Sequence, residues 1–344
     1  MKVLQFTTWY SPRAGGVETH VKRLSEELRR LRWEVEIFTL TDTREPYTRS
    51  FPSFQIPGIP YGFGLFPHPK AFAEALRTDA DIVHCHAYGW PLAWAAYLTK
   101  KLRGTPFVFT THSDPYSKIF SLKDLTRAFP AGSCDRAIAL TAQEMGHLTR
   151  LGIHISKIRV IPNGFDPPVP GPRPLDEPYI LCVGRVEFRH KGQDLLLDAF
   201  QKSRVPHALV YLGDGPDLDR LRARSRGLSK VRLLGHVDEV AKGAWMSNAD
   251  LVVVPSRTEP FGIVALEAGC LGRRLVATRV GGLQHVAGNF ATIANPDSAD
   301  IAKSMLLALS KDPPRTARNL SQEYSWERMA IRVQNVYREL TTCP

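Results

Sequence analysis

The sequence predicts an α/β protein in which two Rossmann-like domains, each built on a doubly wound parallel sheet, face each other across a cleft. Three observations lead to this fold class. Strands and helices alternate along the 344 residues. Apolar runs such as residues 249–255 have the continuous hydrophobicity of strands buried on both faces. A proline-rich stretch at residues 162–178 divides the chain into two halves that repeat the same alternation.

The first half begins with a short apolar strand and an amphipathic helix, predicted at residues 3–6 and 17–31. Further strands follow where four to seven apolar or β-branched residues are bounded by turn residues. They are predicted at residues 34–40, 81–84, 107–110, 137–140 and 159–161. We therefore place a first domain at residues 1–165.

The second half restarts at residues 179–184 and continues with a helix from Gln193. Its other strands are predicted at residues 208–212, 231–234, 251–254 and 275–278. These elements define a second domain at residues 166–325. A final helix at residues 326–340 has helical spacing of its apolar positions, and it packs back on one of the two domains.

The chain carries a formal net charge of +11, which bears on its partners. Basic residues gather on the first helix, from Lys22 to Arg32, and again at residues 220–226. Such groups face an anionic membrane surface, nucleic acid or simply water. We expect no nucleic-acid partner, because no nucleic-acid-binding motif accompanies these charges. An anionic membrane surface remains a possible partner. The aromatic segment 61–70 either contacts lipid or acceptor as an exposed loop or folds onto the core.

No apolar run is long enough to cross a bilayer, and the first residues lead into a strand rather than a signal peptide. We therefore expect a cytoplasmic protein, with peripheral attachment to the inner face of the membrane as an option. The five cysteines form no CxxC pair and are odd in number, so reduced thiols are expected.

Two carboxylates, Glu259 and Glu267, flank a loop that turns into a helix. The loop follows the buried strand at residues 251–254, so Glu259 is placed at the carboxyl edge of the sheet, where ligands bind in open α/β folds. The helix begins near Gly262, and the free N–H groups of its first turn favour an anion such as phosphate. Glu267 lies about two turns further on, within reach of sugar hydroxyls.

Other strand ends carry residues suited to the same ligand. Gly15 and Gly16 precede the first helix, where they either let backbone approach a ligand or form a simple turn. Arg185 and Lys191 follow the first strand of the second domain, and two cations beside a helix start suit a diphosphate. Turns at Gly213 and at residues 235–237 are candidates to line a nucleobase slot. This last group includes His236 and Val237.

Histidines mark one edge of the first domain. His112 directly follows the strand at residues 107–110, where a neutral imidazole can bond a sugar hydroxyl, although a purely structural role is the alternative. His84 and His86 alternate around Cys85, so both rings point to the same face if the strand continues. We predict no metal site, because a third and a fourth ligand for this pair cannot be placed.

Taken together, these motifs resemble those of the retaining glycosyltransferases of family 4, also called glycosyltransferase group 1, which have the GT-B fold. The similarity covers almost the whole chain in the same order. It is carried by residues 15–18, 111–112, 160–166, 184–185 with 191–192, 213–215 and 259–267. Two departures, His285 and Asn295-Pro296, bear on subfamily placement and not on residues assigned to the chemistry.

The resemblance implies roles for individual residues. The donor diphosphate would be held by Gly16, Arg185 and Lys191, and the ribose hydroxyls by Glu267. Glu259, with the backbone of Phe261, Gly262 and Ile263, would hold the transferred sugar and its phosphate, and His112 would bond the sugar near its reacting face. The second domain would then bind the nucleotide sugar, and the first would face the acceptor.

From these roles we expect a retaining hexosyltransferase that uses a UDP- or GDP-sugar donor and a lipid or glycan acceptor. It would work without a metal or other cofactor and release UDP or GDP. A retaining glycosidase uses one carboxylate as nucleophile and another as acid. Because Glu259 is committed to sugar hydroxyls, we expect instead a front-face substitution in which the departing phosphate is the base. A GT-B epimerase and a non-catalytic nucleotide-sugar-binding protein are the alternatives. An NAD-dependent dehydrogenase is disfavoured because the GxGxxG fingerprint is missing.

Overall fold

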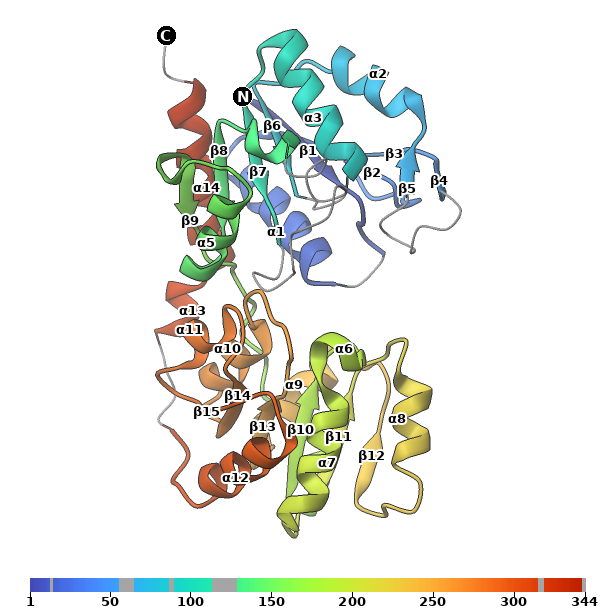
Figure 1. Ribbon diagram of the computed structural model, residues 1–344, viewed down its shortest axis with the longest axis vertical. Coiled ribbons are helices and arrows are strands. Elements are labelled where there is room, and N and C mark those ends of the chain that lie inside the picture. The colour runs from blue at the N-terminus through green and yellow to red at the C-terminus, as the bar shows by residue number, and fades with distance from the viewer. Residues whose placement is uncertain (13–14, 56–64, 87–89, 113–128, 315–318, 342–344) are drawn as a thin grey trace. The chain divides into compact units, whose positions relative to one another are not determined.

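The computed structural model describes residues 1–12, 15–55, 65–86, 90–112, 129–314 and 319–341. The chain divides into two compact units. The first contains residues 1–164 together with 326–344, and the second contains residues 165–325 (Figure 1). The C-terminal helix therefore belongs to the first unit.

The first unit is built on a seven-stranded parallel sheet with the strand order β3-β2-β1-β6-β7-β8-β9. The strand order reverses between β1 and β6, so the loops that follow these two strands diverge to opposite faces of the sheet. The strands are β1 (Lys2–Thr7), β2 (Glu34–Thr39), β3 (Thr48–Ser50), β6 (Ile82–Cys85), β7 (Phe107–Thr110), β8 (Arg136–Ala139) and β9 (Ile158–Val160). A separate antiparallel hairpin is formed by β4 (Ser53–Gln55) and β5 (Leu65–Pro67).

Helices cover both faces of this sheet (Figure 1). Alternate strand residues supply two cores: Leu4 and Phe6 face one side, and Val3 faces the other. The first core lies under α2 (Pro69–Arg77), α3 (Trp90–Arg103) and α5 (Ala142–Arg150). The second lies under α1 (Gly16–Arg30) and α14 (Trp326–Thr341), which pack side by side. A short 3-10 helix, η1 (Ile155–Lys157), precedes β9.

The second unit repeats this design with a six-stranded parallel sheet in the order β12-β11-β10-β13-β14-β15. Its strands are β10 (Tyr179–Val183), β11 (Ala208–Leu212), β12 (Val231–Leu233), β13 (Leu251–Val254), β14 (Leu275–Thr278) and β15 (Thr292–Ala294). Its helices are α6 (Phe188–Lys191), α7 (Gln193–Ser203), α8 (Leu218–Arg224), α9 (Glu239–Ser247), α10 (Ile263–Cys270), α11 (Leu283–Ala287), α12 (Ser298–Leu309) and α13 (Leu320–Glu323). The strand order reverses between β10 and β13.

The predicted fold class, two parallel α/β halves, is confirmed. Predicted strand bounds agree with the observed ones to within a residue or two, and four strands, β7, β11, β13 and β14, agree at both ends. The strands missing from the prediction, β3, β4, β5 and β15, have three residues each, which is too short to show a strand pattern.

The clusters of basic residues are largely paired inside the chain. On α1, Arg23 and Arg30 bind carboxylates one helical turn away, and Lys22 binds Glu45. On α8, Arg220 and Arg222 pair with aspartates three residues before them. Of the segment proposed for lipid contact, residues 61–70, the first four lie outside the described residues. None of the described helices is both long and apolar enough to cross a membrane.

The cysteines expected to be reduced include Cys85, Cys134, Cys182 and Cys270, and all four are free thiols. The first three are buried within the two units. Burial raises the pKa of Cys134 and of Cys182 to about 12, so these thiols stay protonated at neutral pH.

Candidate functional site

Lys191 and Glu259 lie together where the strand order of the second unit reverses, in the segments that follow β10 and β13. Lys191 ends α6, after β10, and Glu259 lies in the loop after β13. The Lys191 Nζ atom is 2.6 Å from Glu259 Oε2, and the Ser256 hydroxyl donates to the same oxygen at 3.4 Å. Both residues lie at the carboxyl edge of the sheet, as predicted from the sequence, and they form an ion pair.

A glycine allows this close approach. Gly192, between α6 and α7, has φ +67°, and a Cβ atom there would lie 2.1 Å from the carbonyl oxygen of Pro255. Only glycine lets the turn after β10 touch the loop after β13. Arg257, in the loop after β13, also contacts α6 and α7. It binds both carboxylate oxygens of Asp194, at 2.6 and 2.8 Å, and donates to the Phe188 carbonyl at 2.5 Å.

The N-terminus of α10 opens at this same loop. Its N-cap is Gly262 with φ +101°, and within this fully described helix no side chain caps the first turn and no acidic residue occupies it. Backbone N–H groups at such a terminus favour an anion. The Phe261 side chain is 3% exposed, and its ring centroid lies 6.0 Å from that of Tyr324. The Phe261 ring is therefore packed inside the second unit.

Glu267 is only half satisfied by the protein. It is 4% exposed, and its Oε1 accepts a hydrogen bond from Lys242 Nζ at 2.8 Å. Its Oε2 is buried and has no hydrogen-bond partner among the described residues. A buried carboxylate oxygen without a partner is costly, so this atom is a candidate acceptor for a ligand hydroxyl. Lys242, on α9, is a site residue that sequence analysis missed.

Burial and pairing act against each other in this ion pair. Burial raises the pKa of Glu267, and the Lys242 ammonium partly offsets the rise. For Lys242, burial acts to lower the pKa, but the carboxylates of Glu267 and Glu239 outweigh it and leave the pKa raised. The opposite charges of the two partners thus stabilise each other against the cost of burial.

Replacing Lys242 by methionine is expected to destabilise the second unit by about 3 kcal/mol, because the change leaves the buried Glu267 carboxylate unpaired. The pKa of Glu267 then rises further above its unfolded value. The loss is therefore largest near neutral pH and shrinks as the pH falls and the carboxyl group takes up a proton. Thermal and urea unfolding between pH 5 and 8 measure both effects.

Two further variants control this experiment. Glu239, the other partner of Lys242, has a side chain that is 84% exposed. Glu239→Gln should therefore cost under about 0.5 kcal/mol of folding stability. The double variant Lys242→Met with Glu267→Leu should recover most of the stability, because it removes both charges. A loss for Lys242→Met no larger than that for Glu239→Gln would show that the pair is not buried in solution.

The remaining predicted residues of the second unit surround this centre less tightly. The Arg185 side chain is 56% exposed, and its Nε lies 3.7 Å from Glu187 Oε2, so it does not share a partner with Lys191. Gly213 donates its N–H to the Gly235 carbonyl at 2.7 Å, which closes the turn predicted for a base. In the following loop His236 is exposed, and Val237 packs against the core.

In the first unit, Gly15 and Gly16 lie at the N-terminus of α1, after β1. A Cβ atom added to Gly16 would meet nothing within 4 Å, so the backbone there is open to a ligand. His112 directly follows β7 and has φ +51°, an uncommon conformation for a residue other than glycine. Its imidazole lies against two others, His20 and His86.

The expectation that His84 and His86 share a face is confirmed, because their ring centroids are 3.8 Å apart. His84 is fully engaged: its Nδ1 lies 2.6 Å from the Tyr337 hydroxyl and its Nε2 2.9 Å from the Thr110 hydroxyl. His20 is not among the residues predicted from the sequence, and α1 brings it to the same edge of the sheet. Its position four residues after Gly16, one turn into the helix, was the available signal.

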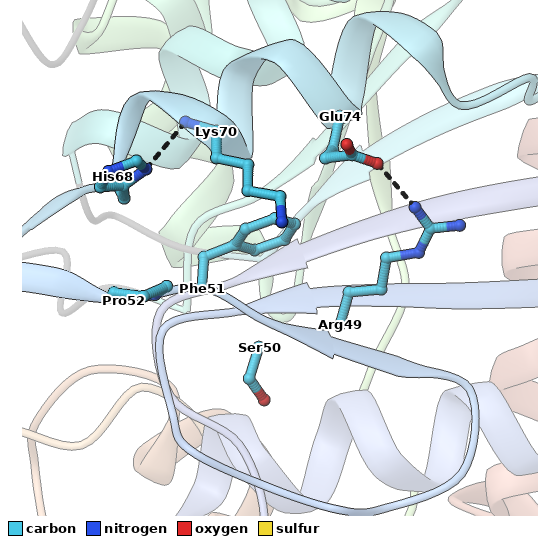
Figure 2. Close-up of a pocket in the computed structure, with 7 residues that line it drawn as sticks. All are labelled: Arg49, Ser50, Phe51, Pro52, His68, Lys70 and Glu74. Atoms are coloured by element: carbon cyan, nitrogen blue, oxygen red, sulfur yellow. Dashed lines mark hydrogen bonds and ion pairs between the residues drawn. The ribbon is translucent and has the colours of Figure 1, made fainter.

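The first unit also has a recess of about 480 Å³ beside the β4–β5 hairpin. Figure 2 shows the Lys70 side chain extending toward the Phe51 ring, and Arg49 bound to Glu74 across the recess. The Arg49–Glu74 distance is 2.9 Å. The residues that line it are Arg49, Ser50, Phe51, Pro52, His68, Lys70 and Glu74. Three of these side chains are basic.

Comparisons with known proteins agree with this architecture. The sequence model of Glycosyltransferase Family 4 matches residues 14–168, and that of Glycosyl transferases group 1 matches residues 177–311. The two matches follow one another along the chain and meet near the boundary between its units.

One curated relative is the D-inositol 3-phosphate glycosyltransferase of Xylanimonas cellulosilytica, which is 29% identical over 388 aligned positions, with 95% of this chain and 92% of the relative covered. Two solved structures share the fold. The sucrose-phosphate synthase of Thermosynechococcus elongatus has a TM-score of 0.81 at 24% identity, with 99% of both chains covered. HepE of Anabaena, in complex with UDP-glucose, has a TM-score of 0.78 at 19% identity, with both chains fully covered.

Proposed function

This chain belongs to the family 4 glycosyltransferases of the GT-B fold, and we propose that it transfers a hexose from a UDP- or GDP-sugar to a lipid or glycan acceptor with retention of configuration. One observation carries the donor assignment. The Lys191–Glu259 pair, the uncapped start of α10 and the half-paired Glu267 all belong to the loops and helix that follow β10 and β13.

Each of these groups matches one part of a nucleotide sugar. In our assignment the N–H groups at the start of α10 and the cations Arg185 and Lys191 bind the diphosphate. Glu267 Oε2 accepts from a ribose hydroxyl, and Glu259 accepts from hydroxyls of the transferred sugar. The turn at Gly213 with His236 and Val237 borders the base. Gly15, Gly16 and His112 are the groups of the first unit that we assign to the diphosphate and the sugar.

The proposed step is a front-face substitution. The acceptor oxygen forms a bond to the anomeric carbon on the side from which the diphosphate departs, and the bond from that carbon to the phosphate oxygen breaks. The proton of the acceptor hydroxyl passes to the departing phosphate. Negative charge grows on the diphosphate as it leaves, and the cations and helix N–H groups stabilise that charge most in the transition state.

The acceptor assignment rests on the first unit. Its recess carries His68 and Lys70 beside the Arg49–Glu74 ion pair, and these two side chains suit an acceptor that bears an anionic group. The name of the Xylanimonas relative includes a phosphorylated inositol, which agrees with such chemistry. The lipid, glycan or inositol nature of the acceptor is part of the proposal.

The stereochemistry of the product tests the proposed mechanism. We expect an α-linked donor sugar to give an α-linked product, whether the acceptor is a glycan or water. Proton NMR of the anomeric signal, read at early times before mutarotation, distinguishes the two anomers. A β-linked product would contradict front-face substitution, and a new sugar nucleotide without transfer would indicate an epimerase.

A further inference from the structure

Three imidazole rings meet at the carboxyl end of the sheet in the first unit. His20 lies on α1, His86 follows β6, and His112 follows β7. One ring nitrogen of each lies within 4.8 Å of a ring nitrogen of the other two. The ring centroids are separated by 4.4 Å for His20 and His112, 5.3 Å for His20 and His86, and 5.7 Å for His86 and His112. Three elements far apart in sequence thus direct imidazoles to one point.

The hydrogen bond of His20 orients its ring as a ligand. Its Nδ1 lies 2.6 Å from the Oδ1 atom of Asn163, and an amide oxygen only accepts, so Nδ1 carries the hydrogen. The lone pair is therefore on Nε2. A metal-binding histidine almost always donates its other N–H to an oxygen in this way.

Metal binding needs a ring nitrogen with a free lone pair, which a neutral imidazole carries. His84 does not take part, because both of its ring nitrogens are already bonded.

The spacing of two rings matches a tetrahedral metal site. His86 Nδ1 lies 3.4 Å from His112 Nε2. Two nitrogens bound to one Zn²⁺ at about 2.0–2.1 Å, at the tetrahedral angle, are about 3.4 Å apart. A good hydrogen bond would be shorter, at about 2.9–3.0 Å.

We propose that His20, His86 and His112 form a binding site for Zn²⁺ or a similar divalent transition-metal ion, and that the bound ion blocks His112 and inhibits glycosyl transfer. Three imidazoles with an open fourth position suit Zn²⁺, Cu²⁺ or Ni²⁺, whereas Mg²⁺ and Ca²⁺ prefer oxygen ligands. The inhibition rests on the proposed function. The binding site itself does not.

Titration of the full-length, tag-free and metal-stripped chain with Co²⁺ tests the binding site. We expect one equivalent to produce the intense visible absorption of four-coordinate Co²⁺, and Zn²⁺ to displace it. His20→Gln and His112→Gln should each weaken binding at least about tenfold, and Asn163→Ala about 10- to 100-fold through the orientation of His20. His154→Gln, which changes an exposed histidine, should bind as the unchanged chain does.

Circular dichroism checks that the variants fold, and His112→Gln, at a half-buried strand end, is the least disruptive of them. An octahedral Co²⁺ spectrum, or equal affinity in the His112→Gln and His154→Gln variants, would overturn the site. Inhibition by Zn²⁺ that a chelator reverses supports the second half of the proposal. Transfer that continues with the site filled overturns that half. A tetrahedral Co²⁺ signal in a chain that turns over no nucleotide sugar leaves the site standing and removes the proposed function.

Discussion

The double variant Arg185→Ala with Lys191→Ala is expected to lose at least about 10²- to 10³-fold in kcat while remaining folded. The two cations are assigned to the diphosphate, whose charge grows as its bond to the sugar breaks. Removal of one preorganised group that stabilises a developing charge commonly costs 10²- to 10³-fold. Arg185 is 56% exposed and Lys191 34%, so the fold depends little on either. Steady-state release of the nucleoside diphosphate measures the effect.

Arg222→Ala with Arg224→Ala is the matched control. It removes the same charge from the same unit, on α8, where the two arginines pair with Asp219 and Asp198. It should leave kcat within about twofold, because surface ion pairs contribute little. Near-normal activity of the Arg185 and Lys191 double variant would rule out their assigned role.

Glu259→Gln is expected to lower kcat by about 10²- to 10³-fold with a smaller change in the KM for the donor. The Oε2 atom of this carboxylate accepts from Lys191 at 2.6 Å and from Ser256 at 3.4 Å. We assign its remaining hydrogen-bond acceptor sites to hydroxyls of the transferred sugar. An amide keeps the shape but removes the charge and replaces one accepting oxygen with a donor, so the bonds to the sugar hydroxyls and to the Lys191 ammonium are weakened. Because the residues are in contact, Glu259→Gln and Lys191→Ala should not be additive.

A carboxylate at the opposite end of the same sheet controls for the change of charge. Glu177, just before β10, binds Arg232 at 2.5 Å, so Glu177→Gln breaks a comparable ion pair away from the loops that follow the strands. We expect this variant to retain its activity. Equal kcat values for Glu177→Gln and Glu259→Gln, or strict additivity of the Glu259 and Lys191 changes, would contradict the assignment.

Much of the fold could be predicted because parallel strands buried on both faces leave continuous apolar runs in the sequence. The run at residues 251–254 is one, and all four of its residues are buried. Edge strands such as β3 leave a weaker signal, because one side faces solvent and three residues carry little pattern. The helix that follows Glu259 begins at Ile263, although the apolar residues that precede it start at Phe261. The start is set by Gly262, which takes a left-handed conformation as the N-cap.

The candidate residues Lys191, Glu259 and His112 could be chosen from the sequence because each lies in the segment that follows a predicted strand. Their partners could not. Lys242 reaches Glu267 from another helix, and Asn163 reaches His20 across 143 residues of sequence. Arg257 is one surface-type residue among many in the sequence, and only the fold shows that it grips Asp194 with two hydrogen bonds. Such contacts depend on tertiary packing, which local pattern does not encode.

Donor binding tests the central claim most directly. UDP, GDP and ADP sugars carrying glucose, mannose or N-acetylglucosamine are compared by thermal shift, on the unchanged chain and on Glu267→Ala, each against its own unliganded midpoint. We expect one donor to raise the midpoint by several degrees, since a ligand at 100 times its Kd stabilises by about 2.7 kcal/mol, and most of this shift to vanish in Glu267→Ala. No response to any of the nine donors, or an equal response in Glu267→Ala, would contradict the account.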